Sequence, residues 1–156
     1  MDSMRILAAT LAILALVPRP ALATGGFSCS VADRNLKLNA EGAFSHGAGA
    51  GVVNFGGSLE VLAKAAPEDL RKLDLAQEHL TQRWLSAKDL RLLVYRERSG
   101  SGPHGSVELI LQTIRRGGEE APYRGSYVLN IYFLSADGSS EGRTITLRGP
   151  AECVVG

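Results

Sequence analysis

Apolar and polar residues alternate with a period of two along most of the second half of the chain, which is typical of β-strands with one buried face. Leu90, Leu92 and Val94 share one face of the first such run, which ends at a loop rich in glycine and serine over residues 99–105. The next run, residues 107–114, alternates in the same way. The pattern predicts a long antiparallel hairpin.

Residues 123–135 form a further run, in which both sets of alternating positions carry apolar side chains. This pattern favours a central strand that is covered on both faces. Asp137 and Gly138 then predict a turn, and residues 143–148 return as another strand. We expect Pro150 to interrupt the ladder before the terminal segment, because proline has no backbone N–H to donate.

The first half of the chain is less regular. Residues 28–44 are compatible with two short strands or with one long bent strand, and residues 55–63 predict another strand. The glycine- and alanine-rich residues 47–51 predict a loop between them.

A helical pattern occurs only in residues 67–85. Pro67 suits the first position of a helix, and the acidic residues that follow it suit the positive end of the helix dipole. A stripe at helical spacing consists of Leu70, Leu73, Leu80 and Trp84. However, Leu73-Asp74-Leu75 also fits the alternation of a strand. We therefore predict a short helix after Pro67, which either continues or gives way to a strand and a second turn.

These elements predict a mainly β fold. The architectures that fit them are an antiparallel β-sandwich or a flattened barrel, with one or two short helices in a crossover. Residues 24–156 have the length of a single domain and contain no internal repeat.

The first 23 residues have the features of a signal peptide. Arg5 precedes an apolar run over residues 6–17, and Ala21-Leu22-Ala23 has the small-x-small pattern of a cleavage site. The apolar run is too short to cross a bilayer, which takes roughly 20 residues, so we expect no membrane span. We predict that residues 1–23 are cleaved and that residues 24–156 are exported to the periplasm or secreted.

The two cysteines of the chain stand near the two ends of the predicted domain. An exported protein meets an oxidising environment, in which a disulfide forms and persists. Two cysteines allow one intramolecular pairing, so we predict a bond between Cys29 and Cys153 that holds the termini together.

The charge of the predicted mature chain is balanced. The whole chain has 17 basic and 16 acidic residues, and the leader removes Arg5, Arg19 and Asp2. A net charge of zero gives no general attraction to nucleic acid, and we expect no nucleic-acid partner. Basic residues are nevertheless in excess over residues 83–116.

The sequence contains no pattern that indicates a metal or a cofactor. His46, His79 and His104 are widely separated, so we predict no metal site. The glycine-rich residues 47–51 lack the spacing and the following helix of a nucleotide site. We therefore expect no cofactor.

No catalytic residue is assigned either. Residues 138–142 match the G-x-S-x-G pattern of serine hydrolases, but they lie between two predicted strands and no histidine follows them. A hydrolase with scattered catalytic residues, for example Glu60, His46 or Glu108, stays open as an alternative because such sites leave no local signature.

The sequence thus predicts an exported, non-enzymatic binding or interaction module of unknown ligand. An envelope protein and an anionic glycan or lipid headgroup are the partners that we consider, since guanidinium groups bind carboxylates and phosphates. The candidate ligand-binding residues, which belong to the predicted hairpin and its ends, are Arg91, Tyr95, Arg96, Arg98, Arg115 and Arg116.

Overall fold

The computed structural model describes residues 25–45, 51–135 and 141–156, so the predicted leader and the turn at Asp137 and Gly138 lie outside the described residues. The mainly β prediction is confirmed. The strands are β1 (Gly26–Ala32), β2 (Leu36–Phe44), β3 (Val52–Val61), β4 (Lys72–Leu75), β5 (Leu80–Leu85), β6 (Asp89–Glu97), β7 (Gly105–Arg115), β8 (Tyr123–Leu134) and β9 (Gly142–Val155), with two short 3-10 turns, η1 (Glu68–Leu70) and η2 (Gln77–His79).

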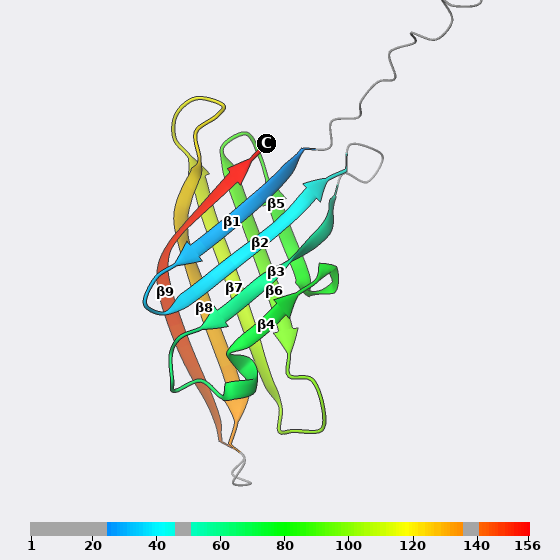
Figure 1. Ribbon diagram of the computed structural model, residues 1–156, viewed down its shortest axis with the longest axis vertical. Coiled ribbons are helices and arrows are strands. Elements are labelled where there is room, and N and C mark those ends of the chain that lie inside the picture. The colour runs from blue at the N-terminus through cyan, green and yellow to red at the C-terminus, as the bar shows by residue number, and fades with distance from the viewer. Residues whose placement is uncertain (1–24, 46–50, 136–140) are drawn as a thin grey trace, which may run out of the picture.

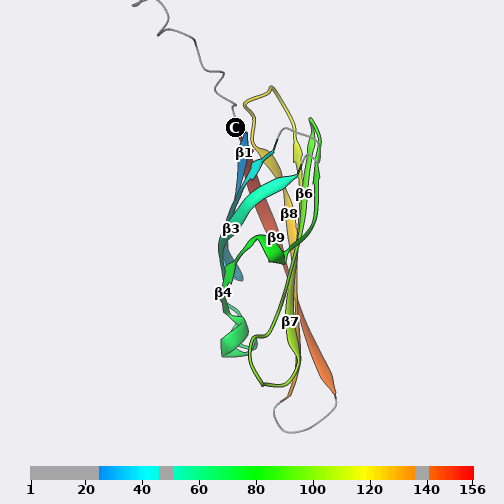
Figure 2. The ribbon, with the colours of Figure 1, turned by 90° about the vertical axis from the view of Figure 1, so that its right-hand side faces the viewer.

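All nine strands belong to one antiparallel sheet, in the order β4-β3-β2-β1-β9-β8-β7-β6-β5. The sheet curls into a half-barrel, so that β1 to β4 face β6 to β8 and β9 passes from one layer to the other (Figures 1 and 2). The layers are thus parts of one sheet, and the sandwich offered by the sequence is not confirmed. The two ends of the sheet, β4 and β5, are joined through η2 along an open side, which we call the seam.

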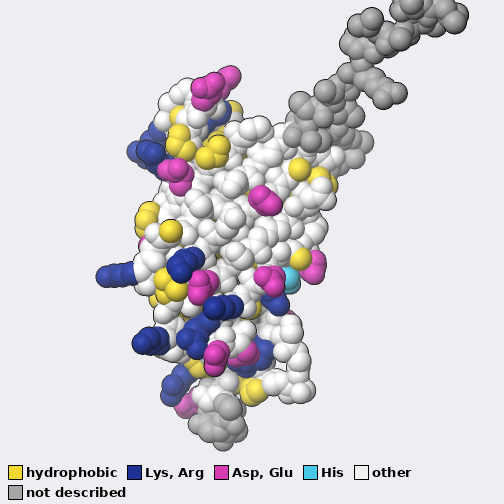
Figure 3. Space-filling model, in the orientation of Figure 1, with side chains coloured by type: hydrophobic (Ala, Val, Ile, Leu, Met, Phe, Trp, Pro, Cys, Tyr) yellow, Lys and Arg dark blue, Asp and Glu magenta, His cyan; other side chains and the backbone are white. Residues whose placement is uncertain are grey.

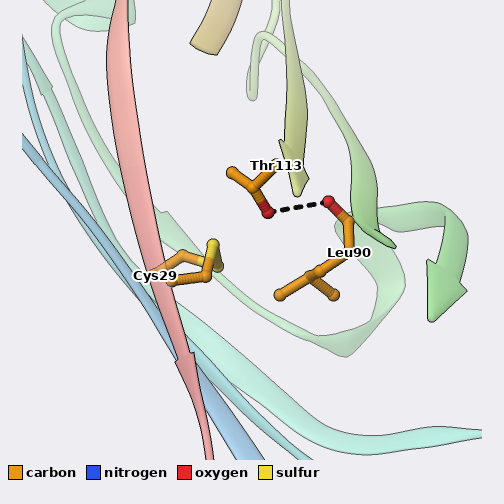
Figure 4. Close-up of a disulfide and its surroundings, with 4 residues drawn as sticks. Cys29, Leu90 and Thr113 are labelled. Carbon is orange, nitrogen blue, oxygen red and sulfur yellow. Dashed lines mark hydrogen bonds between the residues drawn. A yellow bond between two sulfur atoms is a disulfide. The ribbon is translucent and has the colours of Figure 1, made fainter. Parts of the chain in front are cut away.

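The Cys29–Cys153 disulfide predicted from the sequence is present. Its two residues lie directly opposite each other on β1 and β9, in the middle of a junction of only four residue pairs. That junction joins the meander β1 to β4 to the meander β5 to β9. The disulfide is buried, and Figure 4 shows it across the interior from Leu90 and Thr113. The Thr113 hydroxyl donates a hydrogen bond to the Leu90 carbonyl at 2.9 Å.

The core fills the concave side of the sheet, and the predicted alternation of the long hairpin is confirmed. Leu90, Leu92 and Val94 on β6 are at most 3% exposed, and the facing positions of β7 and β8 are equally buried. Burial of this apolar surface is the main stabilising contribution to the fold.

The central position of β8, between β7 and β9, is confirmed, but its predicted cover on both faces is wrong. Val128, Asn130 and Tyr132 on the convex face are only half-buried. Val128 lies beside Ile110 of β7, which itself lies beside Leu93 of β6. Such cross-strand neighbours shield one another, so this face needs no covering layer to carry apolar residues.

Residues 67–85 form two 3-10 turns and two strands. The short helix predicted after Pro67 is the single turn η1, and the alternative of a strand and a second turn is correct. Leu73 and Leu75 are buried on one face of β4, whereas Trp84 of the helical stripe is 61% exposed. The pairing of β4 with β3 satisfies its backbone, which overrides the weak helical pattern.

The prediction that Pro150 interrupts the ladder is wrong, because β9 continues through it and pairs Pro150 with Ser126 of β8. The β1 pairing of β9 begins only at Glu152, so at Pro150 the strand has a β-partner on one side only. Proline is compatible with such an edge-like position.

A polar corner joins the β1–β2 turn to β8. Asp33 accepts hydrogen bonds from the backbone N–H groups of Asn35 and Leu36, at 2.8 and 2.9 Å, and from the buried Tyr127 hydroxyl at 2.8 Å. Gly149, the β9 partner of Tyr127, leaves room for this contact, because a Cβ there would collide with the Asp33 carboxylate and the tyrosine ring.

Candidate functional site

A cavity with a volume of about 1010 Å³ lies inside one end of the half-barrel, where it opens at the seam between β3 and β5. Its position follows from the length of β4. This strand has four residues and pairs only with Gly57 to Glu60, so the first half of β3 has no neighbouring strand on that side. The seam is therefore closed beside β4 and open beyond it.

A side chain occupies part of this unpaired edge of β3. The carboxamide of Gln77 in η2 accepts a hydrogen bond from the Phe55 N–H at 2.8 Å and donates one to the Val52 carbonyl at 3.1 Å. A side-chain amide thus takes the place of the peptide group of a neighbouring strand. Between these two residues, Asn54 has a φ of 55°, where β3 bulges against β2, and the bulge bends β3 at the cavity.

The cavity wall is mainly apolar. Leu90 and Leu92 of β6 form its floor, with exposed fractions of 1% and 2%. The other apolar residues in its lining come from four strands and are Phe44, Val52, Trp84, Leu85 and Val155. Apolar residues from strands far apart in the sequence meet here because the curl of the sheet brings β2, β3 and β9 opposite β5 and β6.

Arg83 supplies the charge in this lining. It lies on β5 opposite Leu92, so the pleat places the two side chains on the same, concave face of the sheet. No other Arg and no Lys, Asp or Glu belongs to the described residues that line the cavity. Arg83 itself is exposed and has no ion pair or side-chain hydrogen bond within the described part of the chain. The cavity therefore combines an apolar floor with one cation at its edge.

Exposed apolar side chains gather along the same seam. Val53, Trp84 and Leu85, with exposed fractions of 40%, 61% and 41%, lie on the two strands that flank it. Ile114 and Val154 are the remaining large apolar residues of the described chain with comparable exposure, and they lie on other strands. Of the three residues beside the seam, Leu85 shares the concave face with the cavity, because it lies opposite Leu90, whereas Trp84 lies opposite Arg91 of the convex face and Val53 is not one of the lining residues.

The structure uses two of the predicted ligand-binding arginines to close the seam beside β4. Arg98 forms a two-pronged ion pair with Asp69 of η1, at 2.5 and 3.3 Å, and donates to the Pro103 carbonyl. Arg96 reaches across to the Asp74 carbonyl of β4. Arg96 lies on the concave side of β6 and Arg98 directly follows that strand, so both residues link this part of the sheet to β4 and η1.

Replacing Arg98 with alanine is expected to lower the free energy of unfolding by about 2 kcal/mol, because a guanidinium that is only 11% exposed loses several charge-assisted hydrogen bonds. Urea unfolding measures the change. Arg116→Ala is the matched control, since Arg116 is exposed in the loop after β7. Equal stability of the two variants would show that the Arg98 contacts contribute nothing.

The other predicted ligand-binding residues are dispersed. Arg91 lies on the convex face beside Asp89, at 3.3 Å. Arg115 donates to the Ala87 and Glu119 carbonyls and lies over the Tyr123 ring. Tyr95, also on the convex face, donates to Glu97 at 3.0 Å, and its pKa is raised by burial and by that carboxylate. The six residues therefore do not form one site.

Figure 3 shows the face formed by β1 to β4, where side chains of both charges are intermingled, mainly in the lower half of the view. Glu60, one of the candidate catalytic residues, lies there between Lys37 and Lys72, at 3.3 and 3.8 Å. Glu108 lies on the convex face of β7 and accepts a hydrogen bond from Asn130 at 3.1 Å. Glu60 and Glu108 therefore lie on different layers of the half-barrel, and His46 lies outside the described residues.

The remaining histidines have structural contacts. His79 accepts a hydrogen bond from the Ala76 N–H at 2.9 Å, and His104 packs against Tyr132. Within residues 25–45, 51–135 and 141–156, no three His, Cys, Asp or Glu side chains gather as metal ligands would.

Sequence reasoning missed Arg83 and the apolar cavity wall. The signal that could have indicated Arg83 was the alternation of Arg83 and Leu85 with Gln82 and Trp84, which becomes visible once residues 80–85 are taken as a strand. This alternation was not recognised because residues 67–85 were interpreted as having a helical pattern.

Comparison with known proteins finds no matching family model, no matching curated protein and no matching solved structure. In the part of the chain that the structure describes, no helix has the length and apolar character needed to span a bilayer. We therefore infer the function from the geometry of the cavity.

Proposed function

We propose that this protein is an exported, non-enzymatic binding module that takes a small, largely apolar molecule into the open end of its half-barrel. The observation that carries the proposal is the cavity of about 1010 Å³, which has an apolar floor and opens at the seam. Its volume is at the upper end of the range of small-molecule sites, roughly 300 to 1,000 Å³.

The energetic support comes from apolar surface that water now contacts. Leu85 of β5, which lines the cavity, is 41% exposed. A ligand that covers such side chains gains roughly 25 cal/mol for each Å² of apolar surface removed from water. The wall is held by hydrogen-bonded strands on both sides, so that the site is preformed and little ordering accompanies binding.

Export is the second part of the proposal. A buried disulfide between Cys29 and Cys153 is consistent with an oxidising compartment outside the cytoplasm.

Residues 24–156, purified with the disulfide intact, are expected to bind N-phenyl-1-naphthylamine, a neutral probe whose fluorescence rises in apolar surroundings. Leu85→Gln should weaken binding about ten-fold, because it places a polar group in the cavity wall. Ile114→Gln is the matched control, since Ile114 is 43% exposed and lies on the convex face, away from the cavity, whereas Leu85 is 41% exposed.

Circular dichroism of both variants establishes that the fold is kept. The proposal fails if the intact protein does not bind the probe, or if the two variants weaken binding equally.

A further inference from the structure

We infer that the ligand of this cavity is an amphipathic anion, whose acidic headgroup pairs with Arg83 while its apolar chain lies over Leu90 and Leu92. The inference rests on the proposed function and adds the chemical class of the ligand. It starts from the register of β5, which places Arg83 opposite the buried Leu92 and therefore on the concave face.

The position of Arg83 along the seam explains why it lacks a protein partner among the described residues. Arg96, on the same concave face, and Arg98 lie beside β4 and η1 and reach across to them. Arg83 lies beyond the end of β4, where the seam opens into the cavity. A guanidinium at this point meets solvent and the cavity, and it is available to a ligand.

The rest of the lining favours an anion over a cation. Among the described lining residues, no carboxylate side chain lies where it could neutralise Arg83. The backbone of Gly156 also lines the cavity, and its carbonyl accepts a hydrogen bond from the Gly26 N–H at 2.7 Å. The Thr81 hydroxyl already donates to the Leu93 carbonyl at 3.0 Å. An arginine fork binds carboxylate, sulfate or phosphate groups through two parallel hydrogen bonds, and it retains its charge at any physiological pH.

The apolar residues on the same face as Arg83 indicate that the ligand has an apolar chain. Leu85, Leu90 and Leu92 continue the same face from the arginine into the interior. A molecule with one acidic end and a linear apolar chain matches both parts of the cavity at once. A small inorganic anion matches only Arg83, and a neutral hydrocarbon matches only the floor.

Displacement of N-phenyl-1-naphthylamine by three ten-carbon compounds tests the inference. Decanoate, decanol and decyltrimethylammonium carry the same chain with a negative, neutral or positive headgroup. At low ionic strength we expect decanoate to bind about ten-fold more tightly than decanol, and the cation to bind most weakly. Added salt should reduce the preference, because Arg83 is exposed and its charge is screened.

Arg83→Gln should remove the preference by weakening decanoate to the level of decanol, with decanol unchanged. Arg116→Gln is the control, because it removes an equally exposed arginine far from the cavity lining and should keep the preference. Sodium acetate, which is a headgroup without a chain, should not displace the probe.

Two results would overturn the claim that the ligand has an anionic headgroup: equal binding of decanoate and decanol to the unaltered protein, or an unchanged preference for decanoate in Arg83→Gln. Either result would leave the proposed apolar site in the cavity intact. Displacement of the probe by acetate would also overturn the proposal of an amphipathic ligand, because it would show that the acidic headgroup binds without an apolar chain. If neither the probe nor any ten-carbon compound binds, the proposed function itself fails.

Discussion

Replacing both cysteines, Cys29→Ala with Cys153→Ala, is expected to lower the free energy of unfolding by about 4 to 5 kcal/mol. The bond links residues 124 positions apart and closes nearly the whole predicted domain into one loop. The unfolded chain gains conformational freedom when that loop opens. The folded state depends on the bond as well, because β1 and β9 share only four residue pairs and this junction joins the two meanders.

Urea unfolding of the oxidised protein and of the double variant measures the loss. The reduced form of the unaltered protein is the matched control, because it keeps both sulfur atoms and lacks only the covalent link. If the reduced protein loses as much stability as the variant, the cross-link accounts for the effect. A difference below about 1 kcal/mol between oxidised and reduced protein would contradict this account.

Asp33→Ala is expected to lower the free energy of unfolding by about 3 kcal/mol at neutral pH. The substitution removes the acceptor of the Asn35 and Leu36 N–H groups at the β1–β2 turn. It also leaves the Tyr127 hydroxyl, which is buried against this carboxylate, without its partner. A buried donor without an acceptor is more costly than the loss of an exposed hydrogen bond.

The effect of Asp33 should depend on pH. Burial raises the pKa of Asp33, but the hydrogen bonds from the Asn35 N–H, the Tyr127 hydroxyl and the Leu36 N–H outweigh it, so the pKa is lowered from its ordinary value of 3.8. A lowered pKa means that the folded state binds the proton less readily than the unfolded state. The stabilisation is therefore complete above the ordinary carboxyl pKa and is lost as the pH falls through the folded-state pKa.

Unfolding of Asp33→Ala and of the unaltered protein across the acidic range checks this pH dependence. The difference between them should be constant near neutrality and shrink at acidic pH. Asp74→Ala is the control, because this exposed aspartate contributes only its backbone carbonyl to the Arg96 contact. A difference that grows towards acidic pH would contradict the role of the ionised carboxylate.

At alkaline pH the relevant group is Tyr127. Burial and the Asp33 contact raise the pKa of Tyr127 to about 12, so its hydroxyl stays protonated well above neutrality.

Local alternation was sufficient to predict the strands of the second half. In β6 and β7 the structure buries the predicted face, and most residues of the other face are polar or half-buried. The pairing of Cys29 with Cys153 was equally accessible, because a chain with two cysteines allows one intramolecular bond.

Residues 67–85 show where local reasoning was insufficient. Their apolar residues fit both a helix and a strand. Residues Lys72 to Leu75 form a strand because their backbone pairs with the edge of β3. The same applies to Arg96 and Arg98, which are separated from Asp74 and Asp69 by more than twenty residues. Their contacts depend on how the two ends of the sheet meet, and no local pattern encodes that.

By itself the sequence determined the mainly β character, the faces of the long hairpin and the disulfide, because each depends on a repeat of two residues or on a count of cysteines. Only the tertiary structure decided that one sheet curls on itself, that its short β4 leaves part of the seam open, and that Arg83 lies at the resulting cavity. These features arise from contacts between strands far apart in the chain, and their geometry depends on strand lengths, bulges and curvature that act together.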